Sequence, residues 1–576
     1  MLALHGTGVG HGIAIGRARI ISRPAPEISR YTVGADAVEA ELERLAAGIR
    51  QARDSLVDLK SGYDGPLPAE VAGLLEAHVT MLEDPMLLDE PSKLVREQHI
   101  NAESALSRFG RKLEMMFSRM QDPYLSSKSI DVAQVVERVI GALMDDGDEL
   151  VDQLGGTDDG EVIVAADLTP ADTIRLKKHR LTGFVTSLGG PISHTAILAR
   201  SMKIPAIVGL HAAIRYLRTG DLLILDGKRG IILANPDESS LAAYQRRREK
   251  IIRRRQALDT LRDAESVTLD GRAVSLMSNV EFPEEVDQSV AQNADGVGLY
   301  RTEFLFMNRS EMPDEEEQYT VYRDILERSR RPVNIRTLDI GADKQVEGAR
   351  SEDGRAINPA LGMRAIRLCL HDLALFKPQL RAIYRASVHG DARLLVPMLS
   401  TMDELDQLYS LIREVKEELS GQGEAFNPDL PVGGMIEVPA AAISADIFAR
   451  KLDFLSIGTN DLIQYTLAID RVDDEVNYLY DPVHPSILRL VKGVIEAGRA
   501  AGVPVLMCGE MAGNPTYTRI LLALGLRSFS MDPSSLLEVR QRVRMSDVGH
   551  LESALPRILA ATEPDEIRSL VQDLNR

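Results

Sequence analysis

The feature that most constrains the fold of this chain is a series of eight short apolar runs, from about residue 265 onward. Stretches of helical pattern separate the runs, so strands and helices are expected to alternate. The runs read AVSLMSNV, DGVGLY, PVNIRTLD, RLLVPML, VGGMIEVP, FLSIGTND, PVLMCGEM and SFSMD. Eight such units over about 310 residues predict a (β/α)8 barrel, with an open doubly wound sheet as the alternative.

The N-terminal half combines a helical block with segments of α/β pattern. Residues 1–21 are Gly-rich with short apolar runs, which indicates strand and turns, whereas residues 30–144 carry apolar positions at helical spacing. Strand-like runs return at EVIVAADL, LTGFVTSL, IPAIVGL and LLILDG. We therefore expect residues 1–21 and 145–235 to form one α/β domain with the helical block inserted. Two domains in series are the alternative.

A highly charged segment, residues 236–262, connects these parts to the barrel region at 263–576. Its arginine clusters could contact nucleic acid, but a solvated connector helix is favoured because the whole chain is acidic. Lys and Arg number 67 against 86 Asp and Glu, which gives a net charge of −19, and only 4% of residues are aromatic. Neither feature suits a surface that binds a polyanion or stacks bases, so nucleic acid is not expected as a partner. The expected fold class is multidomain α/β.

A membrane span and a disulfide framework are not expected either. No stretch of the 576 residues approaches the ~18 uninterrupted apolar residues that a membrane span needs, and the first residues lack the pattern of a secretory signal. The chain has two cysteines, Cys369 and Cys508, which are too few for a disulfide framework. The expected compartment is therefore the reducing cytoplasm.

Polar residues follow most of the predicted barrel strands. In a (β/α)8 barrel the active site lies at the C-terminal ends of the strands, so these side chains are expected to share one mouth. They are Arg301, Arg336, Asp339, Asp343, Lys344, Glu437, Asn460, Asp461, Arg471 and Cys508. Several arginines on one site suit a multivalent anion, because guanidinium matches carboxylate and phosphate oxygens with paired hydrogen bonds.

Two of these residues, Glu437 and Asp461, offer hard oxygen ligands. Few protein ligands beside a phosphorylated substrate are the pattern of a Mg²⁺ site. The alternative is that both carboxylates form internal salt bridges with the arginines. Cys508 is equally open, because a lone strand cysteine is often a small packing residue but can act as an acid–base thiol at the rim of a site.

The sharpest local feature is the Gly-rich turn at residues 189–196, which runs GGPISHTA. Its two glycines allow a tight turn, and Ser193 is placed to cap the helix that follows. His194 would then lie in the first helical turn, where the helix dipole disfavours imidazolium and keeps the ring neutral and nucleophilic. A phosphoryl group on that ring would meet the anion-binding helix N-terminus, and Thr195 could add a hydroxyl donor. A histidine that only caps its helix is the alternative.

Together these motifs resemble those of the phosphoenolpyruvate-utilising enzymes. GGPISHTAILARSMKIPAIVG is similar to the family's phosphohistidine signature. The barrel motifs of the family resemble DGVGLYRTEFLFMNR, RTLDIGADK, NPALGMRAIR, GGMIEVPAAA, DFLSIGTNDLIQYTLAIDR and LMCGEMAG. The resemblance covers nearly the whole chain, and the domain order is similar to that of the phosphoenolpyruvate–protein phosphotransferases, the enzyme I branch of the sugar phosphotransferase system. Pro191-Ile192 departs from the basic residue and Thr that many of these sequences carry.

The resemblance implies roles for individual residues. It makes His194 the nucleophile that becomes phosphorylated, and Cys508 the donor of the proton that turns enolpyruvate into pyruvate. It places phosphoenolpyruvate against Arg301, Arg336, Asn460 and Arg471, and Mg²⁺ on Glu437 and Asp461.

The same resemblance implies the partners. The phosphohistidine would pass its phosphoryl group to the small phosphocarrier protein HPr, docked on residues 30–144, with hinges near 145 and 235–265. Family members dimerise through the barrel, so a homodimer is expected. A dikinase without its ATP domain and a non-enzymatic scaffold are the alternatives, and the complete set of Arg, Glu, Asn, Asp and Cys argues against the scaffold.

Overall fold

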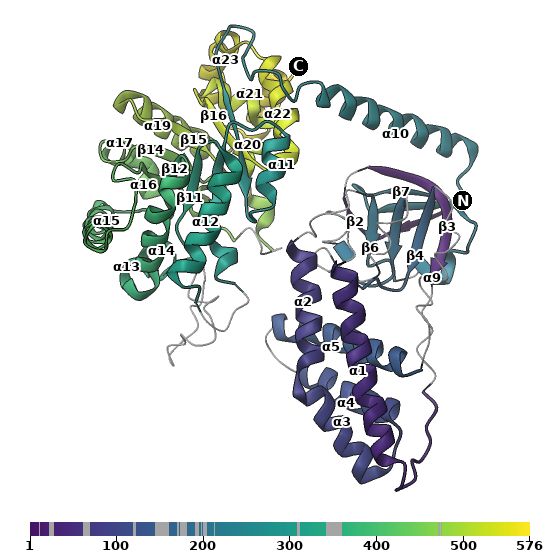
Figure 1. The fold of residues 1–576 in the computed structure, drawn as a ribbon. Helices are drawn as coiled ribbons and strands as arrows, with labels where there is room; N and C mark the ends of the chain where they lie inside the picture. The colour runs from purple at the N-terminus through teal and green to yellow at the C-terminus, as the bar shows by residue number, and fades with distance from the viewer. Residues whose placement is uncertain are drawn as a thin grey trace. The chain divides into compact units, whose positions relative to one another are not determined.

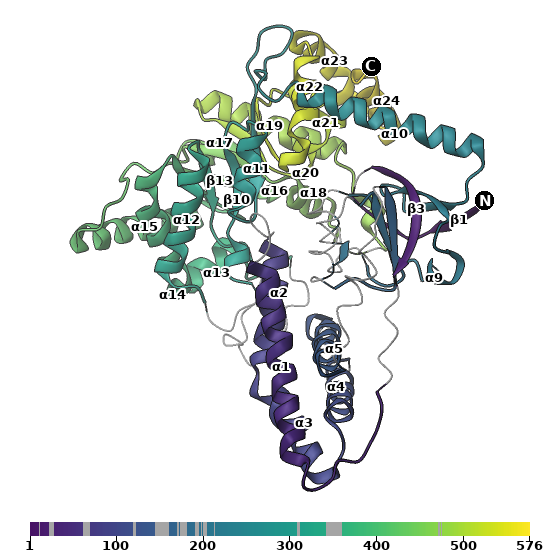
Figure 2. The same ribbon diagram turned by 45° about the vertical axis from the view of Figure 1, so that its right-hand side comes forward.

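The described residues of the computed structural model form two compact units, Met1–Arg254 and Arg255–Arg576, drawn as ribbons in Figures 1 and 2. The structure describes residues 1–10, 12–21, 28–61, 69–118, 123–144, 160–169, 172, 181–190, 195–196, 199, 204–211, 213–307, 312–340, 360–470, 473 and 475–576. None of the helices in these ranges combines the length and the apolar character that a membrane span requires.

A helical bundle occupies the region between residues 38 and 144 of the first unit. Its described helices are α1 (Val38–Ser61), α2 (Ala69–Glu83), α3 (Pro85–Gln98), α4 (Ala102–Ser118) and α5 (Pro123–Met144). Helix α3 begins where the Asp84 side chain accepts a hydrogen bond from the Met86 N–H, which satisfies a free donor of the first turn. Leu45, Leu106 and Val139 are fully buried in the core of the bundle, which stabilises the helices through their apolar faces. The helices predicted for this region are therefore present.

Strands from before and after the helical bundle in the sequence form one eight-stranded sheet. They are β1 (Leu2–His5), β2 (Thr7–Val9), β3 (Ile13–Ile21), β4 (Glu161–Ala165), β5 (Gly183–Thr186), β6 (Ala206–Val208), β7 (Leu222–Asp226) and β8 (Ile231–Ala234). Their order is β1-β8-β7-β3-β4-β5-β6-β2, and a short helix, α9 (Ala213–Tyr216), precedes β7. Strand β3 lies parallel to β4 although the whole bundle separates them in the chain.

One strand of this sheet, β8, is absent from the sequence prediction. It follows β7 through a tight turn that contains Gly230 at φ +65°, and the two strands pair antiparallel. The short run IILA therefore belongs to a hairpin rather than to a separate βα unit.

The charged connector is a single helix, α10 (Glu238–Asp259). Leu241 and Tyr244 in its first half pack against apolar residues of the sheet, and Arg247 forms an ion pair of 2.5 Å with the buried Asp226. Residues 249–257 are exposed, as expected of a solvated helix.

The second unit contains a closed barrel of parallel strands, as the eight apolar runs predict. The strands are β9 (Ser275–Val280), β10 (Val297–Arg301), β11 (Val333–Arg336), β12 (Ala392–Val396), β13 (Val432–Ile436), β14 (Phe454–Ile457), β15 (Val505–Met507) and β16 (Ser528–Met531). Closure occurs between β16 and β9, which pair from Ser528 opposite Ser275 to Met531 opposite Ser278. The alternative of an open doubly wound sheet is therefore wrong.

Helices follow the strands and cover the barrel from outside (Figure 1). They are α11 (Glu285–Ala291), α12 (Glu315–Ser329), α13 (Ala365–His371), α14 (Leu373–Ala386), α15 (Met402–Gln422), α16 (Pro439–Ile443), α17 (Ala445–Phe448), α18 (Thr459–Leu467), α19 (Pro485–Ala501), α20 (Glu510–Gly513), α21 (Pro515–Ala523), α22 (Leu536–Arg544), α23 (Val548–Ala560) and α24 (Pro564–Leu574). A large core fills the space between strands and helices, and a separate small cluster of strand residues with Cys508 packs together. Gly433 makes room in that cluster, because a Cβ there would stand 2.3 Å from the Phe454 ring.

Candidate active site

The side chains expected at the barrel mouth lie at the C-terminal ends of adjacent strands. Strands β10 and β11 end on Arg301 and Arg336, and these two residues are register partners. Glu437 follows β13 directly, and Cys508 follows β15 directly. The alternation of parallel strands and helices therefore brings residues far apart in the sequence to one end of the barrel.

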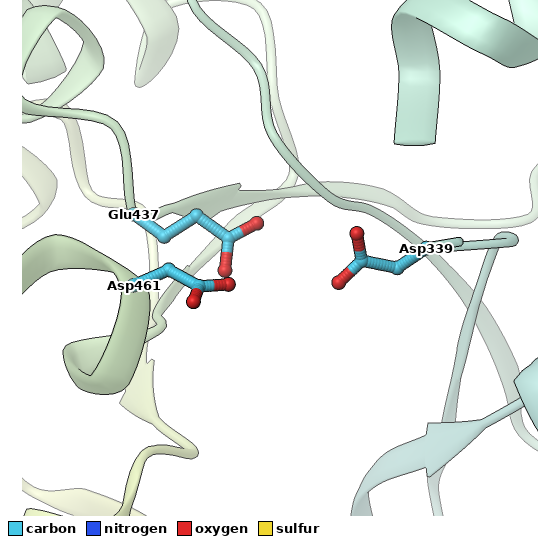
Figure 3. Close-up of side chains that lie close together, drawn as sticks. All are labelled: Asp339, Glu437 and Asp461. Carbon is cyan, nitrogen blue, oxygen red and sulfur yellow. The ribbon is translucent and has the colours of Figure 1, made fainter. Parts of the chain in front are cut away.

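Three carboxylates converge there, from Asp339, Glu437 and Asp461. Their ligand oxygens all lie within 4.8 Å of one another, and Figure 3 shows Glu437 and Asp461 side by side and facing Asp339. Burial, with added repulsion from Asp461 and Asp339, raises the pKa of Glu437 well above its usual value. Like charges in a buried site are unfavourable without a cation, and clustered carboxylate oxygens are the donors that a hard divalent ion prefers. The donor set therefore fits Mg²⁺.

The position of Glu437 is fixed by its neighbours. Its Oε1 accepts a hydrogen bond of 2.7 Å from the Met398 N–H, and only 2% of the residue is exposed. The backbone of Gly458 passes close to the other oxygen, because a Cβ there would stand 2.6 Å from Oε2. Gly458 thus leaves the space that the carboxylate occupies.

Arg336 is buried beside the carboxylates. Its guanidinium forms ion pairs with Glu303 at 2.9 Å and with Asp339 at 3.0 Å. Burial acts to lower the pKa of Arg336, but attraction by Glu303 and Asp339 outweighs it, so the pKa lies above its usual value and the charge is retained. Arg364 binds the other oxygen of Asp339 at 2.8 Å.

The alternative interpretation of Glu437 is a salt bridge with one of the arginines, and the ion pairs of the site argue against it. Arg301 pairs with Glu281, and Arg336 pairs with Glu303 and Asp339. Within the described part of the chain, Glu437 forms no ion pair within 4.0 Å. The arginines are therefore paired with other acids, and the Glu437 carboxyl group is left available as a cation ligand.

Cys508 lies in the apolar cluster of the barrel strands and is 4% exposed. Ser456 donates a hydrogen bond of 3.3 Å to its sulfur, and the sulfur lies 3.7 Å from the Ile457 carbonyl oxygen. Burial raises the pKa of the thiol, a shift that the Ser456 hydrogen bond partly opposes. The group is therefore protonated near neutral pH and holds a proton that it can donate.

Asn460 and Asp461 are consecutive residues in the first turn of α18, yet their side chains have different surroundings. Asn460 exchanges two hydrogen bonds of 3.0 Å with Glu510, through its amide N–H₂ and through its carbonyl oxygen. Asp461 contributes to the group of three carboxylates instead. A helical turn rotates successive side chains by about 100°, which separates the two residues.

Comparison with known proteins decides the family. Three parts of the chain match PEP-utilising enzymes: residues 5–128 match the N-terminal part, 157–230 the mobile domain and 255–548 the PEP-binding domain. The chain belongs to the PEP-utilising enzyme family.

Full-length relatives of this PEP-utilising enzyme carry one name, phosphoenolpyruvate-protein phosphotransferase. The protein of that name from Cupriavidus necator is 44% identical over 583 residues, with 100% of this chain and 99% of the relative covered. That of Geobacillus stearothermophilus is 40% identical over 570 residues, covering 99% and 97%. That of Staphylococcus carnosus is 38% identical over 574 residues, covering 100% and 99%.

Several residues singled out in the sequence of this PEP-utilising enzyme fall outside the described residues. They are Ser193, His194, Asp343, Lys344 and Arg471. Thr195 is described, and its hydroxyl lies within hydrogen-bond distance of Asp167 Oδ1 (3.1 Å) and of the Leu168 carbonyl oxygen (3.3 Å). Thr195 is also 1% exposed, so its hydroxyl is bonded to the loop after β4, whereas the sequence suggests a hydroxyl donor for a phosphoryl group.

Three site residues of the PEP-utilising enzyme are not assigned by sequence reasoning. Asp339 is recognised only as a polar residue near a strand end, and neither Glu303 nor Arg364 is singled out. The available signals are positional: Asp339 follows Arg336 by three residues, and Arg364 lies in the motif NPALGMRAIR. Which loop carboxylates face inward depends on loop geometry, which these patterns do not specify.

Proposed function

We propose that this enzyme transfers the phosphoryl group of phosphoenolpyruvate to His194, releases pyruvate, and passes the group to a histidine of the phosphocarrier protein HPr, the first step of phosphotransferase sugar uptake. Full-length similarity to proteins named phosphoenolpyruvate-protein phosphotransferase supports the reaction. The single observation that carries it is structural. The buried Arg336, three converging carboxylates and the Cys508 thiol lie at the same end of one barrel.

In this proposal Arg301 and Arg336, with Asn460 and Arg471, bind the anionic substrate. Arg336 supports this role through its Nε–H, which is buried and has no hydrogen-bond acceptor among the described residues. The Nε–H of Arg364 is also buried and has no hydrogen-bond acceptor among the described residues. A buried donor without a partner is unfavourable, and phosphate or carboxylate oxygens are strong acceptors for a guanidinium.

Glu437 and Asp461 would hold Mg²⁺, and the geometry adds Asp339 to that set. When bound, the ion neutralises negative charge on the phosphoryl and enolate oxygens. Arg336 is held beside this site by Glu303 and Asp339, so its positive charge is oriented before substrate arrives.

His194 acts as the nucleophile. The neutral imidazole attacks phosphorus, the bond from phosphorus to the enol oxygen breaks, and the enolate is left. Cys508 then donates a proton to C3 of the enolate, which gives pyruvate. His194 must afterwards reach a second protein, so motion is proposed at hinges near 145 and 235–265.

The proposed partner surface is the helical region 30–144, taken as an inserted docking domain for HPr. The rest of the proposed division assigns 1–21 and 145–235 to the mobile α/β domain, 236–262 to the linker and 263–576 to the barrel. A homodimer through the barrel unit is also proposed. It is supported by exposed apolar residues of that unit, Ile443 at 74% and Tyr478 at 77%. Two buried cysteines without a disulfide suit the proposed cytoplasmic location.

The test uses phosphoenolpyruvate labelled with ³²P, Mg²⁺ and purified HPr. Labelled enzyme, followed by labelled HPr and pyruvate, is expected from the wild-type chain. His194→Ala should accept no label, and label retained on that variant would contradict the nucleophile. Phosphorylation that requires ATP instead would support the dikinase alternative.

A further inference from the structure

A buried hydroxyl contacts the sulfur of Cys508. Ser456 lies in β14, is 0% exposed, and donates to Sγ over 3.3 Å from the neighbouring strand. Ser456 is the register partner of Leu506, and Cys508 lies two residues beyond Leu506, on the same side of the chain. The contact is therefore built into the pairing of β14 with β15.

The other contacts of Cys508 fall on its backbone and on its thiol. Its carbonyl oxygen accepts a hydrogen bond of 3.0 Å from the Asn279 side chain, and Ser530 holds that amide through a hydrogen bond of 2.6 Å. Asn279 and Ser530 thus fix the backbone of Cys508 but do not contact its sulfur. The thiol donates a hydrogen bond of 3.7 Å to the Ile457 carbonyl oxygen, and its sulfur accepts one of 3.3 Å from Ser456.

We infer that Ser456 is a positioning residue that orients the Cys508 thiol and stabilises the thiolate left after the proton is transferred. The inference rests on the proposed role of Cys508 as proton donor. Ser456 is not in the group that binds substrate or metal, and it acts only through the sulfur.

The chemistry of the step shows why a hydroxyl is needed there. The electron pair of the enolate C2–C3 double bond takes the proton and forms the new C3–H bond, while an oxygen lone pair forms the C2 carbonyl. The S–H bond breaks and sulfur keeps its electron pair, so a thiolate is left in an apolar cluster. A hydrogen bond to an ionised acceptor is about twice as strong as one to a neutral acceptor. The Ser456 donor therefore becomes stronger as the proton leaves.

The composition of the cluster makes this donor unusual. Its other members are Leu299, Leu395, Met435, Phe454 and Leu506, which have no group that can donate to a thiolate. An anion in such surroundings is costly without a hydrogen bond. Burial accordingly raises the pKa of Cys508. The hydrogen bond from Ser456 is the largest effect that lowers it, and the charges of Arg336 and Arg301 make smaller contributions in the same direction.

The experiment compares Ser456→Ala with Ser278→Ala. Ser278 is a matched control because it is also 0% exposed in a barrel strand, but its hydroxyl contacts Ser289 and the Gly296 carbonyl. Pyruvate release from phosphoenolpyruvate gives kcat and KM. In D₂O, (Z)-3-fluorophosphoenolpyruvate gives 3-fluoropyruvate with a stereogenic CHDF carbon, trapped at once by reduction, which shows whether the enzyme or the solvent delivered the proton.

Ser456→Ala is expected to lower kcat about 10- to 100-fold, with KM within about twofold, and to shift the product from one configuration toward an equal mixture. Ser278→Ala should keep the wild-type kcat and configuration. Ser456→Cys, a weaker donor of similar size, is assayed with excess dithiothreitol so that no disulfide forms with Cys508. It should fall between Ser456→Ala and the wild type, and it serves if the alanine variant does not fold. If Ser456→Ala and Ser278→Ala lower the melting temperature equally and Ser456→Ala leaves the configuration of 3-fluoropyruvate unchanged, the role of Ser456 is structural and the inference is overturned.

A parallel Cys508→Ala variant separates this inference from the proposed function. If Cys508→Ala gives a mixed configuration while Ser456→Ala matches the wild type, Cys508 is the donor and the role of Ser456 is wrong. If wild-type enzyme releases no pyruvate, or if Cys508→Ala keeps one configuration, the proposed function itself fails at this step.

Discussion

Gly458 lies so close to Glu437 that a Cβ would stand 2.6 Å from the carboxylate oxygen Oε2. Gly458→Ala should therefore displace this carboxylate and weaken Mg²⁺ binding by about tenfold or more, since metal sites depend on ligand position. Isothermal titration with Mg²⁺ measures the effect. Gly421→Ala is the control, because a Cβ there meets nothing within 4 Å, and unchanged affinity in Gly458→Ala would contradict the proposed ligand.

The variant Glu437→Gln should lose the stabilisation that comes from bound Mg²⁺ while keeping the stability of the metal-free protein. Glu437→Gln relieves repulsion with Asp461 and Asp339 and keeps an oxygen for the Met398 N–H. In EDTA its melting temperature should equal or exceed that of the wild type. Added Mg²⁺ should raise the melting temperature of the wild type, because an ion that binds the folded state stabilises it. The variant lacks the carboxylate ligand, so its melting temperature should not change. Scanning calorimetry with and without Mg²⁺ gives both values, and an exposed residue, Glu496→Gln, is the control.

Both cysteines should resist alkylation in the native protein. Burial raises the pKa of Cys508 and of Cys369 above the usual value of 9.0, and the thiolate is the reactive form. Because a raised pKa keeps the thiol neutral, the rate with iodoacetamide should stay low at pH 7.5 and increase only as the pH passes above about 9. Mass spectrometry of each cysteine peptide, with urea-unfolded protein as reference, measures the profile. Rapid modification of Cys508 at pH 7 would show an activated thiolate instead.

A buried arginine should contribute strongly to the stability of the barrel unit. Arg540 is 2% exposed and donates to backbone carbonyls of Arg262, Gln292 and Asn293. Arg540→Met leaves these acceptors unpaired, and we expect a loss of about 3 kcal/mol or more in the free energy of unfolding. Urea denaturation measures it. Arg544→Met removes one hydrogen bond of an exposed side chain and should cost under about 1 kcal/mol.

The strands of the barrel could be predicted from the sequence because each is a compact apolar run with helical pattern on either side. Runs such as RLLVPML and FLSIGTND correspond to β12 and β14 directly. Strand β8 could not be separated in the same way, since only the turn at Gly230 divides it from β7. Local patterns thus specify strands but not hairpin partners.

The sequence predicts the position of a site residue only where that residue directly follows a strand. Glu437 and Cys508 follow their strands immediately, so parallel pairing alone places them at the mouth. Asp339 lies three residues beyond β11, and its inward orientation depends on ion pairs with Arg336 and Arg364. Such contacts form only in the tertiary structure. The sequence therefore contains no pattern that distinguishes Asp339 from an exposed loop carboxylate.

Closure of the barrel between β9 and β16 has a consequence for synthesis on the ribosome. The strand at Ser275–Val280 finds its second neighbour only when Ser528–Met531 has emerged. A nascent chain that stops before this point carries every residue of the proposed metal and substrate sites but leaves a sheet edge unpaired, and an unpaired edge can associate with other chains. The β9 edge therefore stays open to other chains until Ser528–Met531 has been translated.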